Sequence, residues 1–446
     1  MDARLAAYDR PVPRYTSYPT AAQFHTGVGP DQQRAWLTDL NESSATLYLH
    51  VPFCTELCWY CACNTVAVNR AESLAAYAAA LEAEIDRVAA LAPELIVSGV
   101  QWGGGTPSHL GAERLTALSE RLAGRFDRVS GAEVSMEIDP RTCDDDTVEA
   151  MVCMGINRAS MGVQDFDPAV QKAINRMQSA ELTGDVIARL RRAGIHRINL
   201  DLVYGLPLQT LDGLARTLDA AVALQPDRFA VFGYAHVPWM KARQELIDEK
   251  TLPGGPLRAE MAALVARRLA EAGYVQIGLD HYARPRDPLA GAAACGRLRR
   301  SFQGYVVSES PWVVGLGASA ISSLPQGFTQ NAAAAGRYRT MIEEGGLATV
   351  RGLELDDSDR LRGEIISRLM CVNSVDVGDI CRRHDVRPAE FLAGIEDLPK
   401  LVEDGLVVVE GDKLSVTDLG KPLVRCVAAA FDGHLAHGQG RHSRAI

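Results

Sequence analysis

Four cysteines fall within ten consecutive positions of this chain, at Cys54, Cys58, Cys61 and Cys63. The first three have the spacing C-x3-C-x2-C, which places three thiols on one short loop. Iron–sulfur clusters are held by cysteine thiolates, usually four for a [4Fe–4S] cube. Three thiolates can hold three irons and leave the fourth iron free for chelation by a small molecule. The spacing therefore predicts a catalytic [4Fe–4S] cluster held by Cys54, Cys58 and Cys61.

Cys63 differs from its neighbours because it follows Cys61 by two positions, too close for both to reach the same cube with ease. We interpret Cys63 as a non-ligand near the cluster. A structural zinc site normally uses four ligands, often as two separated C-x2-C pairs, and no second pair exists here. A disulfide framework is typical of small secreted chains that are dense in cysteine. The other cysteines occur singly, at Cys143, Cys153, Cys295, Cys371, Cys381 and Cys426.

The composition is that of an ordinary globular protein, with 446 residues of which 47% are hydrophobic and 23% charged. This length is sufficient for a large core and a second domain. The formal net charge of −10 argues against a general nucleic-acid or membrane-surface binder, because such proteins use basic patches. The first residues resemble no signal peptide, and no apolar run approaches the length of about 18 that a membrane span needs. Together with ten cysteines, these features predict a cytoplasmic protein in a reducing compartment.

Apolar segments with strand character alternate along the chain with amphipathic segments of helical character. The predicted strands cover residues 46–51, 95–102, 134–138, 159–163, 198–203 and 229–234. The predicted helices include residues 71–91, 113–126, 180–193 and 211–224. Val134, Met136 and Ile138 show the period of two that places side chains on one face of a strand. Strand–helix alternation at this spacing predicts an α/β protein with a parallel sheet built from βα units.

A regular series of residues stands at or just past the carboxyl ends of the predicted strands. The series consists of Gly104, Glu137, Gln164, Asp201 and Ala235. Their separations of 33, 27, 37 and 34 residues each correspond to about one βα unit. Taken singly, Glu137 or Asp201 is more typical of a strand-end cap. Because chemistry in barrel enzymes collects at that end of the strands, the whole series beside a cluster loop favours a site.

The alternation fades after about Ala283, and the rest of the chain divides into two parts. Residues 287–300 and 330–344 are predicted as helix or loop, and the glycine-rich run 314–322 would let backbone approach a ligand closely. Helices at 360–370 and 388–404, a hairpin at 406–417 and a helix at about 421–431 predict a winged-helix-like unit. From residue 355 onward, 16 acidic and 12 basic residues give a net charge of −4, which disfavours DNA binding. The predicted domains are an N-terminal segment 1–44, a catalytic barrel with its extension 45–350, and a C-terminal domain 351–446.

Sequence blocks along almost the whole chain resemble a known family. The cluster loop and the turn 103–107 are similar to the radical S-adenosylmethionine (SAM) enzymes, and the further blocks resemble the oxygen-independent coproporphyrinogen III oxidases, also called dehydrogenases. The blocks are 10–20, 54–64 with Cys63 included, 103–107, 136–140, 160–165, 175–176, 201–207, 234–236, 280–281, 302–305 and 317–322. The cysteine loop alone would indicate only the superfamily, whereas the additional blocks in the same order favour the specific family.

The resemblance implies a fold and a reaction. The implied fold is the incomplete parallel (β/α) barrel of the radical SAM type with a smaller, mostly helical C-terminal domain. In the family, SAM chelates the open iron and the reduced cluster cleaves it to a 5′-deoxyadenosyl radical. That radical starts the oxidative decarboxylation of two propionates of coproporphyrinogen III to vinyl groups, which gives protoporphyrinogen IX for haem biosynthesis. The cofactors supply this chemistry, while the protein orients and shields them.

The resemblance also implies a set of SAM-contacting residues. They are Tyr48, Tyr60, Gly104, Gly105, Thr106, Glu137, Gln164, Arg176, Asp201, Ala235 and Ile321. A carboxylate in this set can bind the ammonium or ribose hydroxyls, and an arginine can grip a carboxylate in two places. The family resemblance includes a second SAM molecule, to which Ile321 and its small-residue loop contribute. A monomer and an electron donor such as flavodoxin or ferredoxin are implied as well.

Coproporphyrinogen III carries four carboxylates, so positive charge is expected to face it. Arg14, Arg297, Arg299 and Arg300 are candidates, although solvated arginines are the commoner case. Residues 15–20 of the N-terminal segment are expected to lie across the mouth of the site and to shield the radical.

Three rival functions fit part of the sequence. A radical SAM haem chaperone shares the three-cysteine loop, but such relatives generally lack the equivalent of Cys63 and the segment 10–20, both of which are present here. A radical SAM methyltransferase would use a second SAM as methyl donor. A DNA-binding regulator, which the C-terminal unit suggests, fits the acidic charge poorly.

Overall fold

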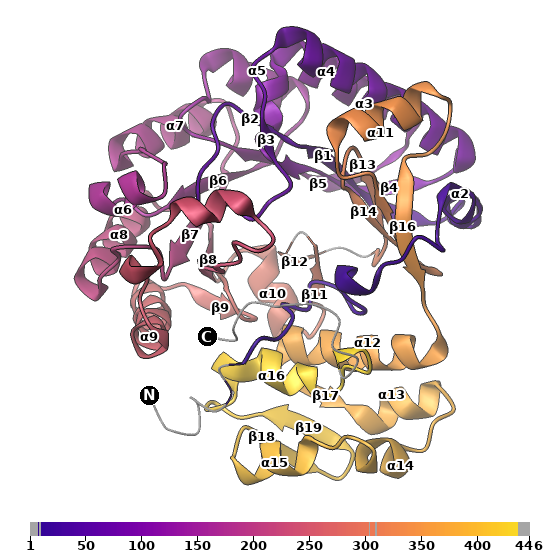
Figure 1. Cartoon of the computed structure of the whole chain (residues 1–446), viewed down its shortest axis with the longest axis vertical. Coiled ribbons are helices and arrows are strands. Elements are labelled where there is room, and N and C mark those ends of the chain that lie inside the picture. The colour runs from indigo at the N-terminus through magenta and orange to yellow at the C-terminus, as the bar shows by residue number, and fades with distance from the viewer. Residues whose placement is uncertain (1–7, 9, 303, 308–309, 436–446) are drawn as a thin grey trace.

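The computed structural model describes residue 8 and residues 10–302, 304–307 and 310–435. Three of the predicted regions lie partly outside the described residues: the N-terminal segment at residues 1–7 and 9, the 302–305 block at residue 303, and the C-terminal domain at residues 436–446. One long sheet forms the centre of the molecule, helices surround it, and a smaller unit packs below it in the view of Figure 1. No helix of the described part combines the length and apolar character that crossing a membrane requires.

The central sheet confirms the six predicted strands. It has twelve strands in the order β16-β15-β14-β13-β1-β4-β5-β6-β7-β8-β10-β9. The six predicted strands pair in parallel as consecutive neighbours: β1 (Ser44–Val51), β4 (Ile96–Gly104), β5 (Arg128–Ile138), β6 (Arg158–Gln164), β7 (Arg197–Tyr204) and β8 (Arg228–Gly233). Because β16 and β9 stand at opposite edges without pairing to each other, the parallel barrel is incomplete, as the resemblance implies.

Amphipathic helices cover the outside of this sheet (Figure 1). In α3 (Ala71–Leu91), Leu81, Ile85 and Val88 recur at helical spacing and are buried, so one face of the helix packs on the strands. The other helices of this part are α2 (Pro30–Asp39), α4 (Ala112–Arg125), α5 (Asp145–Cys153), α6 (Pro168–Ala173), α7 (Ala180–Arg192), α8 (Leu211–Ala223), α9 (Gly255–Glu271) and α10 (Pro288–Ala294). Short 3-10 turns are η1 (Ala21–Gln23), η2 (Pro107–Leu110), η3 (Ala242–Leu246) and η4 (Glu249–Thr251).

Short strands extend the sheet at both edges. At one edge β9 (Val275–Ile277) and β10 (His281–Ala283) pair antiparallel beside β8. At the other edge β13 (Val313–Leu316) lies parallel to β1, and β14 (Ile321–Leu324), β15 (Gly327–Asn331) and β16 (Thr349–Glu354) follow antiparallel. The prediction of helix or loop for 330–344 is therefore wrong at its start, because residues 330–331 are the end of β15. The same prediction for 287–300 is wrong at its end, because residues 299–300 belong to β11 (Arg299–Ser301), which pairs with β12 (Gly304–Val306). Strands of three to five residues are too short to show a period.

A buried carboxylate fixes the β13–β15 extension against the barrel. Glu84 of α3 accepts hydrogen bonds from the backbone N of Gly317 at 2.6 Å, Asn331 Nδ2 at 2.7 Å and the Tyr338 hydroxyl at 2.7 Å. These donors come from the β13–β14 turn, from β15 and from α11 (Ala335–Glu343). Buried polar groups need such partners, so this one side chain holds three elements in register.

The smaller unit contains the predicted C-terminal hairpin, formed by β18 (Val407–Glu410) and β19 (Lys413–Val416). Its other elements are α12 (Asp357–Val372), β17 (Ser374–Asp376), α13 (Val377–Arg383), α14 (Pro388–Ala393), α15 (Leu398–Glu403), η5 (Lys421–Leu423) and α16 (Val424–Ala429). The unit has its own hydrophobic core. Val12, Tyr15 and Tyr18 of the N-terminal segment are part of that core, so the first described residues pack on the last part of the chain.

Candidate active site

The four neighbouring cysteines lie on a loop that leaves the carboxyl end of β1. The loop begins in β2 (Phe53–Cys54), which pairs with β3 (Val66–Ala67), so the chain returns to its starting point. The backbone N of Thr106 donates to the carbonyl of Phe53 at 2.8 Å, and Asn175 Nδ2 donates to the carbonyl of Leu57 at 3.1 Å. Hydrogen bonds to the turns after β4 and α6 therefore hold the loop from two sides.

The turn after β4 approaches this loop so closely that a side chain has no room. A Cβ at Gly105 would lie 2.6 Å from the carbonyl oxygen of Phe53. At Gly104 the backbone has a φ of +115°, and a Cβ would lie 2.7 Å from the ring of His50. These two predicted site glycines thus have a packing role that is independent of any ligand contact.

A cavity of about 160 Å³ opens beside the cysteine loop at the carboxyl ends of the parallel strands. Most of the predicted site residues line it together. They are Cys54, Cys58, Tyr60, Cys61, Gly104, Gly105, Thr106, Glu137, Gln164, Arg176 and Asp201. Residues separated by nearly 150 positions are brought together because each parallel strand ends at the same edge of the sheet. Gln164, at the end of β6, has a φ of +71°, a strained backbone conformation for a residue with a side chain.

Three predicted SAM-contacting residues do not line this cavity. The hydroxyl of Tyr48 lies 3.0 Å from Nδ1 of the buried His50, on β1. The carbonyl of Ala235 accepts a hydrogen bond of 3.2 Å from Gln244 Nε2, which also donates to the backbone of the cysteine loop. Ile321 begins β14 and packs against a small apolar cluster near the N-terminal segment.

Positive charge surrounds the sulfur of Cys58. Arg176 Nη1 lies 3.6 Å from its Sγ and Arg141 Nη2 lies 3.8 Å from it. Both arginines also bind Asp139, with Arg141 Nη2 at 2.6 Å and Arg176 Nη1 at 3.3 Å from Oδ2. Burial raises the pKa of Asp139, but the two guanidinium groups outweigh it and hold the pKa below the ordinary value. This arrangement suits a negatively charged sulfur ligand.

Two carboxyl groups of the strand-end series face the same cavity. Enclosure of Glu137 in the protein and the neighbouring charge of Asp201 raise the pKa of Glu137 to about 7. Enclosure also raises the pKa of Asp201, although Asn199 Nδ2 donates to it at 2.7 Å and the Ser160 hydroxyl at 3.3 Å. The backbone N of Gly104 donates to Glu137 Oε2 at 3.1 Å. Such a pair favours a positively charged or hydrogen-bond-donating ligand.

Cys61 and Cys63 influence each other directly. A hydrogen bond from Cys63 lowers the pKa of Cys61 to about 6, and the same interaction raises the pKa of Cys63. Cys61 is therefore the member of the pair that becomes a thiolate first, and thiolates are the form that binds metal.

The donor set fits an iron–sulfur cube. Three thiols line one cavity, the Thr106 hydroxyl lies 3.7 Å from Cys54 Sγ, and arginines approach Cys58. Within the described ranges, no three His, Cys, Asp or Glu side chains converge closely enough to hold a single metal ion. A cube places each thiolate on a different iron, so its ligands need not converge. Arg176 Nε is buried with no hydrogen-bond partner in the described structure, which leaves it available to a bound cofactor.

Sequence reasoning did not assign several residues that line the cavity. Asp139 follows β5 directly, so its position at a strand end was a signal that the strand-end series could have included. Arg141, in the turn after β5, and Arg243, in η3, carried no such signal because they contact the cysteine loop from positions far away in the sequence. Arg243 Nη1 donates to Thr65 Oγ1 at 2.7 Å, which fixes the end of the cysteine loop. The lining residues without an assigned role are Glu56, Leu57, Cys63, Thr65, Ile138, Asp139, Arg141, Ser160, Gly162 and Arg243.

Comparisons with known proteins agree with this geometry. Residues 48–221 match the model of the radical SAM superfamily, and residues 355–423 match that of the HemN C-terminal domain. The chain is 48% identical to the oxygen-independent coproporphyrinogen III oxidase of Bradyrhizobium diazoefficiens, covering 100% of this chain and 99% of the relative. It is 40% identical to the enzyme of the same name from Pseudomonas aeruginosa, covering 99% and 98%.

A solved structure extends the similarity to three dimensions. The coproporphyrinogen III oxidase of Escherichia coli, described as a radical SAM enzyme, superposes with a TM-score of 0.91 at 36% sequence identity. The match covers 94% of this chain and 97% of that one. Similarity of this extent includes the barrel, the cysteine loop and the C-terminal unit together. The chain belongs to the oxygen-independent coproporphyrinogen III oxidase family of radical SAM enzymes.

Proposed function

We propose that this protein catalyses the oxygen-independent oxidative decarboxylation of two propionate side chains of coproporphyrinogen III to vinyl groups, giving protoporphyrinogen IX in haem biosynthesis. Each propionate loses one hydrogen atom, one electron and carbon dioxide. The observation that carries the proposal is the single cavity that joins three cysteines to Glu137 and Arg176. Similarity over the full chain to enzymes named for this substrate supports it.

The radical SAM family uses a [4Fe–4S] cluster and SAM, and both are cofactors of this protein. When bound, they supply one electron and the 5′-deoxyadenosyl radical that removes hydrogen from the substrate. Cys54, Cys58 and Cys61 hold three irons of the cluster, and Cys63 is not a ligand. The guanidinium groups beside Cys58 offset the negative charge that accumulates at the sulfurs.

The other lining residues bind and orient SAM. Glu137 and Asp201 accept hydrogen bonds from its ammonium or ribose hydroxyls, and the free Nε of Arg176 donates to an acceptor of the ligand. The remaining members of this set are Tyr60, Gly104, Gly105, Thr106 and Gln164, with Tyr48 and Ala235 behind them. Two SAM molecules bind, and Ile321, which lies outside the cavity lining, belongs to the second.

The N-terminal segment covers the active site. Arg14 Nη2 donates to the carbonyl of Gly233 at the carboxyl end of β8, at 2.7 Å. The next residue, Tyr15, donates its hydroxyl to Asp432 Oδ2 of the C-terminal unit at 2.9 Å. These two contacts support a segment that runs from the C-terminal unit to the rim of the barrel and shields the radical from water.

The protein acts as a cytoplasmic monomer that receives electrons from a carrier such as flavodoxin or ferredoxin. All ten cysteines are free, which suits a reducing compartment. A one-electron carrier suits the cluster because each turnover begins with a single electron.

Product analysis tests the proposed function. Anaerobically reconstituted protein is given reductant, SAM and coproporphyrinogen III, and the products are followed by mass spectrometry. Two successive losses of carbon dioxide and two hydrogens are expected. Stable haem binding without turnover would instead favour the chaperone, and a methylated product would favour the methyltransferase.

A further inference from the structure

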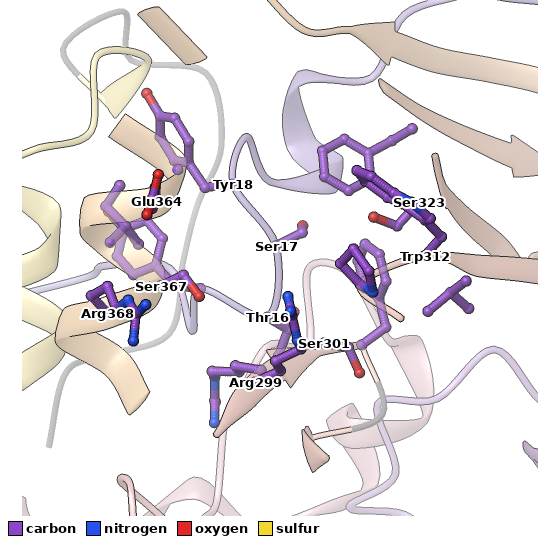
Figure 2. Close-up of a pocket in the computed structure, with 18 of the residues that line it drawn as sticks. Thr16, Ser17, Tyr18, Arg299, Ser301, Trp312, Ser323, Glu364, Ser367 and Arg368 are labelled. Carbon is purple, nitrogen blue, oxygen red and sulfur yellow. The ribbon is translucent and has the colours of Figure 1, made fainter. Parts of the chain in front are cut away.

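A second cavity, of about 870 Å³, lies where three distant parts of the chain meet (Figure 2). Most of its walls come from three segments: residues 15–18 of the N-terminal segment, residues 296–302, which contain β11, and residues 359–368 of α12. Residues at the ends of β13 and β14, together with Val307, Phe328 and Leu355, complete them. None of its lining residues lines the cluster cavity. Its volume falls in the upper part of the range of small-molecule sites, which suits a large organic ligand.

The walls of this cavity carry a marked excess of positive charge. Arg297, Arg299, Arg300, Arg360 and Arg368 line it, against two carboxylates. Arg300 is neutralised in part, because its Nη1 lies 3.7 Å from Asp280. Within the described residues, no carboxylate lies within ion-pair distance of the other four arginines.

In the part of the chain that the structure describes, Arg360 and Arg368 are held in place by neutral groups. Arg360 Nη1 donates to the carbonyl of Pro325 at 2.6 Å, and Arg368 Nη1 donates to the carbonyl of Gly296 at 2.8 Å. A guanidinium group that binds backbone carbonyls keeps its full charge and has further N–H groups to offer. These two arginines are therefore positioned without being neutralised.

The two carboxylates of the cavity wall already have other partners. Glu364 accepts two hydrogen bonds from Arg383 of α13, at 2.6 and 2.9 Å. Asp359 Oδ1 lies 2.7 Å from His434 Nε2. They do not compensate the arginines, so the cavity favours an anion.

The cavity also has an apolar wall opposite part of this charge. In Figure 2, Arg299 and Arg368 lie on one side of the cavity, while Trp312 lies on the other. Phe302 and Phe328 line it too, with ring centroids 6.2 Å apart in an edge-to-face arrangement. A charged rim facing an aromatic wall suits a flat apolar ring system that carries several carboxylates.

A chain of contacts links this cavity to the cluster cavity. Asp201 of β7 pairs in register with Ala230 of β8, and Ala230 pairs with His281 of β10. The backbones of Asp201 and His281 are thus two strand spacings apart, about 10 Å. His281 Nδ1 lies 2.7 Å from Asp280, and Asp280 contacts Arg300 in the wall of the large cavity. Arg300 thus joins the wall of the large cavity to the strands that carry Asp201 of the cluster cavity.

We infer that this cavity binds the tetrapyrrole substrate, with Arg299 and Arg368 gripping propionates that are not reacting and the aromatic wall holding the ring. The inference rests on the proposed function and extends it to the residues that select a tetracarboxylate. Arg297 and Arg360 add to the positive potential. Because guanidinium groups bind carboxylates in a bidentate manner, a porphyrin without carboxylates gains nothing from them.

Binding of coproporphyrin III, the stable oxidised form of the substrate, tests the inference. Its fluorescence is titrated with full-length, anaerobically reconstituted protein, and etioporphyrin, which lacks carboxylates, serves as the comparison ligand. The variants are the single substitutions Arg299→Ala and Arg368→Ala and the double variant that carries both. The matched control is Arg192→Ala. Arg192 is an exposed arginine of α7 whose Nε donates to the backbone carbonyl of Ala188 at 3.4 Å. Thermal melting verifies that each variant is folded.

The expected result is a loss of affinity for coproporphyrin III of about tenfold for each arginine removed, with no loss in the control. Etioporphyrin binding should be the same in all proteins, and Arg299→Lys should recover part of the loss because it restores the charge. Unchanged coproporphyrin III affinity in the folded double variant would overturn the inference, even if the wild type decarboxylates the substrate normally. Arginine-dependent binding by a wild type that performs no decarboxylation would support the inference and reject the proposed function.

Discussion

Arg176 Nη1 lies 3.6 Å from Cys58 Sγ, and the same guanidinium group binds Asp139. A single buried side chain thus connects the carboxyl end of β5 with the middle of the cysteine loop. It gives the loop a fixed position before any cofactor binds, and it offsets negative charge at one of the proposed ligands. The stability of the apoprotein and the binding of the cluster therefore depend on the same residue.

Replacing Arg176 by Met should destabilise the apoprotein strongly. The change removes the hydrogen bonds of Arg176 to Asp139 and to the Gly162 carbonyl, whereas Arg141 still pairs with Asp139, so a loss of about 2–3 kcal/mol is expected. The matched control is Arg125→Met. Arg125 pairs with Asp86 at 2.8 Å at the surface, where the side chain of Arg125 is 47% exposed and that of Asp86 is 34% exposed. The control should lose less than about 1 kcal/mol. Urea denaturation of both variants measures the difference, and equal losses would contradict the structural role of Arg176.

Single Cys→Ser variants should separate the ligands from their neighbour. Cys54→Ser, Cys58→Ser and Cys61→Ser should each abolish cluster-dependent activity and lose most of the iron after reconstitution, since each removes one of three protein ligands. Cys63→Ser should retain the cluster. Iron and sulfide analysis with visible absorption spectra checks this. Loss of the cluster in Cys63→Ser together with its retention in Cys61→Ser would reverse the ligand assignment.

The raised pKa of Glu137 predicts a pH dependence of stability. Its carboxyl has a pKa of about 7 in the folded protein against an ordinary value of 4.5, so the folded state binds the proton more tightly. The stabilisation is fully present below pH 4.5 and is lost as the pH rises to about 7. Its size is about 3 kcal/mol.

The variant Glu137→Gln isolates this contribution. Its free energy of unfolding should fall less than that of the wild type between pH 4.5 and 7, because it cannot ionise. Denaturation of the cofactor-free wild type and variant at each pH of this range gives the difference between their free energies of unfolding. Other titrating groups, such as His50, are present in both proteins, so their contributions largely cancel in this difference. A difference that is flat with pH would show that the Glu137 carboxyl is not held in its protonated form.

Gly105→Ala should destabilise the protein by about 1–3 kcal/mol, because the added Cβ would overlap the carbonyl group of Phe53 and push the cysteine loop away. Gly124→Ala is the matched control. Gly124 lies in α4, and apart from its chain neighbours and the backbone of its own helix, no atom of the described structure lies within 4 Å of the position that a Cβ would take there. The control should therefore be neutral or stabilising by up to about 1 kcal/mol. Thermal unfolding of the two variants compares them. If Gly105→Ala unfolds at the same temperature as the wild type, the start of the cysteine loop at Phe53 is not packed against Gly105 as tightly as the structure shows.

The parallel core was predictable from sequence because its strands are long and separated by amphipathic helices. The period of two at Val134, Met136 and Ile138 indicates a strand whatever its partners, and βα spacing then fixes the side of the sheet on which Glu137 and Asp201 emerge. The β13–β16 extension gave no comparable pattern. Val313–Leu316 is buried along its whole length, so it lacks alternation, and its place beside β1 depends on Glu84, far away in the sequence.

The site was predictable to a similar degree and for a similar reason. The cysteine spacing and the strand-end series are local patterns, and the structure brings most of these residues to one cavity. Arg141 and Arg243 were not assigned because their contacts with the cysteine loop exist only once the folded chain places that loop beside them. Cys58 lies 83 positions from Arg141, and no local pattern connects them.

Mössbauer spectroscopy of anaerobically reconstituted, iron-57-labelled protein, with and without SAM, tests the open iron site most directly. We predict a [4Fe–4S] cube in which one iron of the four changes its signal when SAM is added, while the three held by cysteine do not. A cube whose four irons are already bound by protein side chains, or the absence of a cube from active protein, would contradict this prediction.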